Sequence, residues 1–118
     1  MNTLKNKVNL IGNLGARPDV REIASGRKVA RMVVATHSTT RTASGERDTN
    51  TQWHTVVAWG RTAEQAERLL GKGSSVALEG RLVHRSYAGR DGRTRHISEI
   101  VLNEFRLLPS SKRNAKAA

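Results

Sequence analysis

Two tryptophans bound the segment 53–59, which reads WHTVVAW. Because side chains alternate between the two faces of a β-strand, this segment as a strand carries both indole rings on one face and His54, Val56 and Ala58 on the other. Two Trp, one Tyr and one Phe are the only aromatic residues of the chain. A face that holds two of them is therefore either the middle of a hydrophobic core or a platform on which flat ligands stack.

Strands separated by turn residues, with one helix, account for the rest of the pattern. Apolar runs that break at Gly, Pro, Asn or Asp predict strands at residues 7–14, 28–37, 53–59, 75–83 and 97–108, with a short extension of the first at 20–23. Between the third and fourth strands, Thr62 and Gln65 fit a capping box, and the spacing predicts a helix over 61–70. Its apolar stripe consists of Ala63, Ala66, Leu69 and Leu70.

This order of elements is that of the OB-fold, an all-β, five-stranded Greek-key barrel with one short helix between strands 3 and 4. Five short strands could also form a sandwich, but the position of the helix favours the barrel. Large rings strain a small barrel interior, which favours Val56 and Ala58 inside. The chain length allows one such domain, at residues 1–108, and the basic segment 109–118 is expected to be a disordered tail.

Two polar segments extend from the predicted strands. Residues 38–52 show no hydrophobic periodicity, so we expect a long loop that is either a mobile connection or a binding arm. Residues 81–96 are expected to form a basic hairpin that turns at 88–92, with Tyr87 beside the turn. The arginines proposed to contact phosphates come from this hairpin and from the loop: Arg81, Arg85, Arg90, Arg93, Arg95 and Arg41.

The charge of the chain indicates a polyanionic partner. Its 21 Lys and Arg against 10 Asp and Glu give a formal net charge of +11, and nucleic acid is the leading candidate. An anionic membrane would require a basic amphipathic helix or a lipid signal, whereas the predicted helix is short and carries acids as well as bases. A single strand exposes its base faces as well as its phosphates, and Trp53, Trp59 and Tyr87 could stack on them. On pattern alone, the alternative of core tryptophans and a solvated hairpin is nearly as good.

Several chemistries lack the residues that they need. The chain contains no Cys, so it has neither a disulfide framework nor a thiolate metal site, and together with the absence of a long apolar run this indicates the cytoplasm. The segment 71–74, GKGS, follows a helix instead of preceding one, so it does not fit a phosphate-binding loop. The four histidines lie on separate elements, and no nucleophile signature occurs. We therefore expect no metal, no cofactor and no enzyme.

Many short segments in order resemble one family, the bacterial single-stranded DNA-binding proteins (SSB). They are NKVNLIGNLG at 6–15, PDVR at 18–21, SGRKVA at 25–30, AT at 35–36, WHTVV at 53–57 with Gly60, AE at 63–64, KGS at 72–74, EGRL at 79–82, DG at 91–92, IV at 100–101 and NEF at 103–105. The resemblance implies an OB-fold that binds single-stranded DNA without sequence preference. It also implies a homotetramer in the cytoplasm, associated with the nucleoid, that protects DNA during replication, recombination and repair.

The same resemblance assigns roles to the rings. Trp53 matches a strand tryptophan that stacks on a base, Trp59 stands at the place of a stacking phenylalanine, and Tyr87 at that of a tryptophan in the basic hairpin. A further stacking tryptophan of many relatives has Thr40 nearest to its place. With one ring fewer, we expect weaker stacking, proportionally more electrostatic binding and a steep dependence on salt.

The end of the sequence is a second departure from the family. Full-length relatives carry a tail with an acidic tip that recruits replication and repair enzymes, whereas this sequence ends in KRNAKAA, so no recruitment through such a tip is expected. A short, dimeric OB-fold relative, the primosomal replication protein N, is therefore an alternative. An OB-fold nuclease, which would need clustered carboxylates, and a basic barrel that binds RNA are further alternatives.

Overall fold

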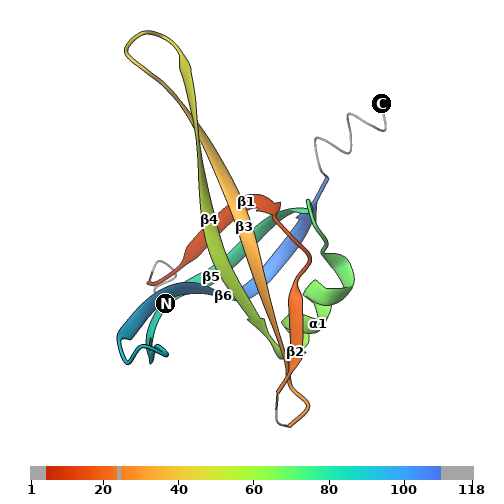
Figure 1. Cartoon of the computed structure of the whole chain (residues 1–118). Coiled ribbons are helices and arrows are strands. Elements are labelled where there is room, and N and C mark those ends of the chain that lie inside the picture. Colours follow the sequence, from red (N-terminus) through yellow and green to blue (C-terminus); the bar gives the residue numbers. More distant parts are fainter. Residues whose placement is uncertain (1–4, 24, 110–118) are drawn as a thin grey trace.

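The computed structural model describes residues 5–23 and 25–109, which form six strands and one helix (Figure 1). In chain order these elements are β1 (Val8–Leu14), β2 (Asp19–Glu22), β3 (Lys28–Arg41), β4 (Arg47–Trp59), α1 (Gly60–Leu69), β5 (Ser75–Ala88) and β6 (Thr94–Leu108). The short extension predicted at 20–23 is β2. Apart from Pro109, the predicted tail lies outside the described residues.

Five strands close into a barrel. The sheet order is β1-β5-β6-β4-β3-β2, and an additional pairing of β1 with β3 closes the first five of these strands into the barrel. This pairing consists of Asn13 opposite Ala35 and Leu14 opposite Val34. A Cβ at Gly12 would collide with the carbonyl of Ala35, so glycine at this position lets β1 pass from β5 to β3. The barrel, with its helix between β4 and β5, is the predicted OB-fold, and the sandwich is wrong.

Small and branched apolar side chains fill the barrel. Val34, Val56 and Val76 are its largest fully buried side chains, and Ala58 is fully buried as well. The helix α1 covers one end of the barrel through its buried alanines and Leu70. The prediction that Val56 and Ala58 point inward is therefore confirmed.

The start of the helix differs from the prediction. The N-cap is Trp59, which makes no side-chain cap hydrogen bond, and the helix begins at Gly60, so the capping box of Thr62 with Gln65 is wrong. Gly60 has a φ of 60°, a left-handed conformation that lets the chain turn from β4 directly into the helix. The predicted stripe also includes one surface residue, since Leu69 is 51% exposed.

The predicted loop at 38–52 is wrong as well, because this segment is the outer part of a long hairpin. β3 and β4 pair without interruption from Val29 opposite Trp59 to Arg41 opposite Arg47. Only residues 42–46 form the turn, in which the Thr42 N–H donates to the Glu46 carbonyl at 2.9 Å. The hairpin projects beyond the barrel (Figure 1), so both of its faces meet solvent and neither needs apolar residues. Hydrophobic periodicity is absent for that reason.

The basic hairpin predicted at 81–96 is present, and its strands are longer than expected. β5 and β6 pair as far as Ala88 opposite Thr94, with one register shift at Glu79 and Gly80. In the turn, the Gly89 N–H donates to the carbonyl of Arg93 at 2.8 Å. Two long hairpins therefore extend from one barrel. We call residues 38–50 the β3–β4 arm and residues 84–98 the β5–β6 arm.

Candidate nucleic-acid interface

Both tryptophans of β4 lie on the surface. Trp53 is 61% exposed and Trp59 38% exposed, whereas Val56 and Ala58 between them are fully buried. The alternation expected of a strand is therefore kept along this part of β4, with the indole rings directed away from the barrel. Of the two readings that the sequence left open, the surface platform agrees with the structure and the tryptophan core does not.

The register between strands extends this surface to the β5–β6 arm. Val57 of β4 lies beside Val101 of β6, and Val101 lies opposite Arg81 of β5. From Arg81, alternation leads through Arg85 to Tyr87, which is 49% exposed. We call this surface the outer face. It consists of Val29, Arg31, Val33 and Ala35 of β3, Trp53, Thr55, Val57 and Trp59 of β4, Arg81, Val83, Arg85 and Tyr87 of β5, and Arg95, Ile97, Glu99 and Val101 of β6.

A glycine supports the Trp53 ring. A Cβ at Gly15 would lie 2.7 Å from Cζ3 of Trp53, so the ring packs directly against the Gly15 backbone. That backbone is held to the barrel because the Gly15 N–H donates to the Val33 carbonyl at 2.9 Å. The ring is thus fixed from one side, while most of its surface faces solvent.

An arginine that the sequence analysis did not single out covers part of Trp59. Cζ of Arg27, from the turn before β3, lies 5.3 Å from the centroid of the Trp59 ring, within the range of a cation–π interaction. A base that stacks on Trp59 therefore uses the other side of the ring or takes the place of Arg27. In either arrangement a positive charge lies close to the stacking position.

A groove of about 550 Å³ runs along the outer face beside Trp59. Four arginines from β2, β3 and β5 line it, together with two acids and a floor of valines. We call it the basic groove. Its lining residues are Asp19, Arg21, Val29, Arg31, Val57, Trp59, Arg81, Val83, Arg85, Glu99 and Val101. Of the predicted residues, the structure thus brings Trp59, Arg81 and Arg85 together here.

The lining of the basic groove includes a buried carboxylate that lies between two arginines. Arg85 donates from Nε to Oε1 of Glu99 at 2.8 Å and from Nη2 to Oε2 at 3.1 Å. Arg31 donates from Nη2 to Oε2 at 3.2 Å. Glu99 is only 5% exposed. The hydrogen bond and the charge of Glu99 raise the pKa of Arg85 above its ordinary value, as expected for a guanidinium bound to an ionised carboxylate.

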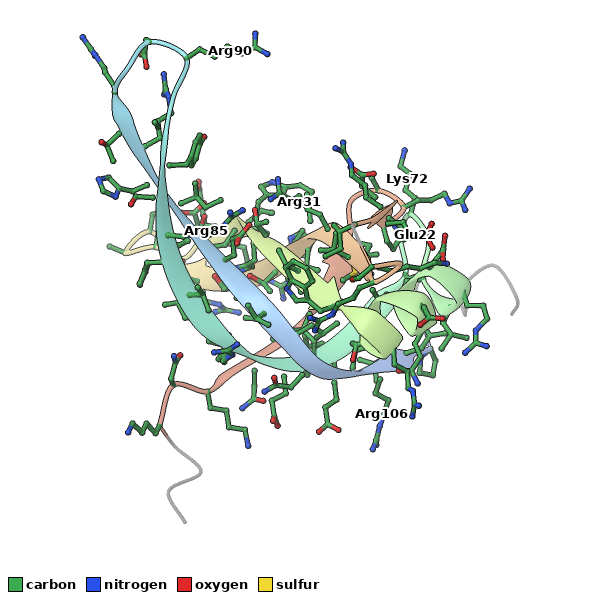
Figure 2. The ribbon with its side chains drawn as sticks, turned by 90° about the horizontal axis from the view of Figure 1, so that it is seen from below. Glu22, Arg31, Lys72, Arg85, Arg90 and Arg106 are labelled. Carbon is green, nitrogen blue, oxygen red and sulfur yellow. The ribbon has the colours of Figure 1, made fainter. Side chains whose placement is uncertain are left out.

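Arg31 reaches Glu99 by crossing a neighbouring strand. β3 and β6 both flank β4 and do not flank each other, so the Arg31 side chain must pass over β4 to reach a carboxylate on β6. Val57 of β4 lies opposite Arg31 and is only 6% exposed although it belongs to the outer face. The crossing arginine accounts for this burial. Figure 2 shows Arg31 and Arg85 close together.

The remaining hairpin arginines lie farther out, on the β5–β6 arm. Arg90 is at its tip (Figure 2). Asp91 organises this end of the arm, because its Oδ1 accepts from the backbone N–H of Arg93 at 3.1 Å and its Oδ2 lies 3.2 Å from Nη2 of Arg95. Arg90, Arg93 and Arg95 are exposed and surround a single acid, so the arm is strongly basic.

The β3–β4 arm brings two like charges together. Arg41 lies directly opposite Arg47, and alternation places this pair on the same side of the hairpin as Trp53. Like charges directly opposite each other destabilise a hairpin unless an anion lies between them. Thr40 is opposite Asp48 and falls on the other side of the hairpin, so the position without a ring does not lie beside Trp53.

Sequence reasoning missed four side chains of this surface: Arg21, Arg27, Arg31 and Glu99. A partial signal existed for Arg31, because it alternates with valines in a predicted strand. Its meeting with Glu99 depends on the register of strands far apart in the chain, which no local pattern contains. Among residues 5–23 and 25–109, no three His, Asp or Glu side chains are grouped to hold a metal, and no helix is long and apolar enough to cross a membrane.

The sequence matches a known family over nearly all of the described residues. The profile of the single-strand binding protein family matches residues 5–108. The chain belongs to this family. Two single-stranded DNA-binding proteins of Neisseria meningitidis, from serogroups A and B, are each 41% identical over 113 residues, which is 96% of this chain and 65% of the relative. That of Xanthomonas campestris is 40% identical over 103 residues, 87% of this chain and 60% of the relative.

Solved structures of the single-strand binding family have the same barrel. The Plasmodium falciparum SSB in complex with ssDNA has a TM-score of 0.80 at 31% identity and covers 92% of this chain and 100% of its own. A deletion mutant of the single-stranded DNA binding protein from Thermus aquaticus has a TM-score of 0.78 at 31% identity, over 90% of this chain and 51% of its own. The chain spans just under two thirds of the length of the curated relatives, 65% for those from Neisseria.

Proposed function

We propose that this chain binds single-stranded DNA without sequence preference and protects it during replication, recombination and repair, in the cytoplasm and in association with the nucleoid. The observation that carries the proposal is the outer face, on which Trp53, Trp59 and Tyr87 are exposed beside the basic groove. Membership of the single-strand binding family supports it. The solved P. falciparum complex supports it as well, because that SSB holds ssDNA on the same fold.

Binding follows from two kinds of contact. Bases stack on the three rings, which works with any base because every base has a flat π-face. Phosphates are bound by the arginines of the basic groove and of the two arms, where Arg81, Arg85, Arg90, Arg93, Arg95 and Arg41 are the proposed contacts. Neither contact reads the edges of the bases, so the binding carries no sequence preference.

Tryptophan fluorescence during titration with oligo-dT tests this function. Stacking on Trp53 and Trp59 is expected to quench the emission strongly and to saturate. Unchanged emission at saturating DNA would contradict the stacking platform. Competition between poly-dT and poly-U in the same assay separates a DNA-binding protein from an RNA-binding barrel, and intact labelled DNA after incubation with Mg²⁺ or Ca²⁺ would dispose of the nuclease alternative.

The support beneath Trp53 leads to a prediction. Gly15→Ala is expected to weaken oligo-dT binding by up to about tenfold, because the new Cβ would push the Trp53 ring out of position and cost part of one stacking contact. The fluorescence titration measures this. Gly71→Ala is the matched control, since a Cβ at Gly71 meets nothing within 4 Å, and it should bind as the unaltered chain does. Equal affinities of the two variants would show that the ring does not depend on Gly15.

We propose further that the protein is a homotetramer. One edge of β1 pairs with β5, whereas its other edge pairs with β3 only at Asn13 and Leu14. This leaves the second edge of the earlier part of β1 without a strand partner among the described residues, beside Ile11, which is 70% exposed. An unpaired edge next to an apolar side chain favours contact with another copy. A mass in solution of four times 13.0 kDa would agree, and a dimer would favour a role like that of the primosomal replication protein N.

A further inference from the structure

We propose that Glu99 limits the affinity of the basic groove for DNA, because its buried carboxylate neutralises part of the charge of Arg31 and Arg85. The inference rests on the proposed DNA-binding function and assigns a specific role within that site. It starts from a buried carboxylate in a groove that four arginines line.

Arg31, Arg85 and Glu99 form one hydrogen-bonded group. Arg31 comes from β3, Arg85 from β5 and Glu99 from β6, and three hydrogen bonds of 2.8 to 3.2 Å join them. At 5% exposure, Glu99 is the one buried charged residue within the described part of the chain. Ionised side chains are buried at this level only when they are paired, since a carboxylate without partners would be strongly disfavoured there. The attraction between Glu99 and the two arginines is therefore stronger than that within an ion pair on the surface.

The two arginines nevertheless remain available to DNA. Their side chains are 54% and 52% exposed, for Arg31 and Arg85 respectively. A guanidinium has five N–H donors; Arg85 uses two of them on Glu99 and Arg31 uses one. The unused donors can bind a phosphate while the carboxylate stays in place. The phosphate then meets two positive charges and one negative charge, a net charge of only one.

Arg81 offers an internal comparison. It lines the same basic groove and makes no ion pair with the residues that the structure describes. A phosphate bound at Arg81 therefore experiences its full positive charge. Of the four arginines of the groove, Arg81 keeps its full charge, Arg21 lies 3.5 Å from Asp19, and Arg31 and Arg85 share Glu99. Release of DNA from the Arg31 and Arg85 pair is therefore easier than release from Arg81.

Glu99→Gln tests the inference by removing the charge and keeping the shape. We expect it to bind oligo-dT about three- to tenfold more tightly at low salt, as the loss of one repulsive charge several ångströms from a phosphate implies. The slope of log affinity against log salt should become steeper. Glu67→Gln is the matched control: Glu67 is paired with Lys28 at 3.0 Å and lies outside the groove lining, so the same charge change should alter affinity by less than about twofold.

A second comparison does not depend on the folding of the Glu99 variant. Arg85→Gln/Glu99→Gln removes one charge of each sign and leaves the net charge of the group unchanged, so it should bind oligo-dT within about twofold of the unaltered chain, whereas Arg85→Gln alone should bind more weakly. Glu99→Gln binding that is equal to or weaker than that of the unaltered chain, with the fold intact by circular dichroism, would overturn the inference. If Glu99→Gln fails to fold, the inference is overturned when Arg85→Gln/Glu99→Gln binds oligo-dT as weakly as Arg85→Gln alone. No binding of oligo-dT by the unaltered chain would instead refute the proposed function.

Discussion

Raising the salt concentration from about 50 to 200 mM is expected to weaken the binding of oligo-dT by about a hundredfold. The affinity of single strands falls with salt by about 0.7 in log–log slope for each neutralised phosphate, and roughly five such contacts produce this loss. The structure supports at least that number, since the basic groove and the two arms offer many separate arginines. Isothermal or fluorescence titrations at four salt concentrations measure the slope.

The slope of log affinity against log salt is expected to be steep because the chain offers few rings for stacking and many cations for phosphates. Three exposed aromatic residues, Trp53, Trp59 and Tyr87, serve a chain with a net charge of +11. Arg41 and Arg47, directly opposite each other, add a place where an anion relieves repulsion. A nearly flat dependence on salt would contradict this account and would mean that stacking alone holds the DNA. Titration with an uncharged-backbone analogue of oligo-dT provides the control, and its affinity should hardly change with salt.

Trp53→Ala is expected to lower the affinity for oligo-dT by about five- to 150-fold, which corresponds to the loss of one stacked base at about 1 to 3 kcal/mol. The barrel should remain folded, because Trp53 is 61% exposed and contributes nothing to the buried cluster. Trp53→Phe should recover much of the loss, since it restores a flat ring at the same place. Fluorescence anisotropy of labelled oligo-dT measures all three proteins.

The complementary change is in the core. Val56→Ala removes buried methyl groups from a fully buried side chain of the same strand and should lower stability by about 0.5 to 2 kcal/mol while leaving the affinity of the folded protein unchanged. A Trp53→Ala protein that loses as much stability as Val56→Ala but, while folded, binds oligo-dT with unchanged affinity would refute the platform.

The sequence predicts those features that depend on residues close together in the chain. Alternation along a single strand was enough to separate Val56 and Ala58 from the tryptophans, and the spacing of small residues was enough to locate α1. The β3–β4 arm was missed because a hairpin with solvent on both faces needs no apolar pattern. The capping box failed because Gly60 allows the helix to start two residues before Thr62.

The contacts across the barrel were beyond reach of any local argument. Arg31 and Glu99 are far apart in the chain and meet only because β3 and β6 flank the same strand. Their pairing depends on barrel closure and on the register of three strands, each of which would have to be correct to within one residue. For the same reason, the sequence predicted Arg85 as a phosphate contact without its buried partner.

The seam of the barrel lies at Trp53. β1 and β3 are joined by only two residue pairs, and Ala35, a member of one of them, also lies opposite Trp53, whose ring packs on Gly15 at the end of β1. A base stacked on this ring would cover one of the two joints of the barrel that consist of only two residue pairs. Bound DNA would therefore hold this joint closed, and part of the binding free energy would appear as resistance of the whole domain to unfolding.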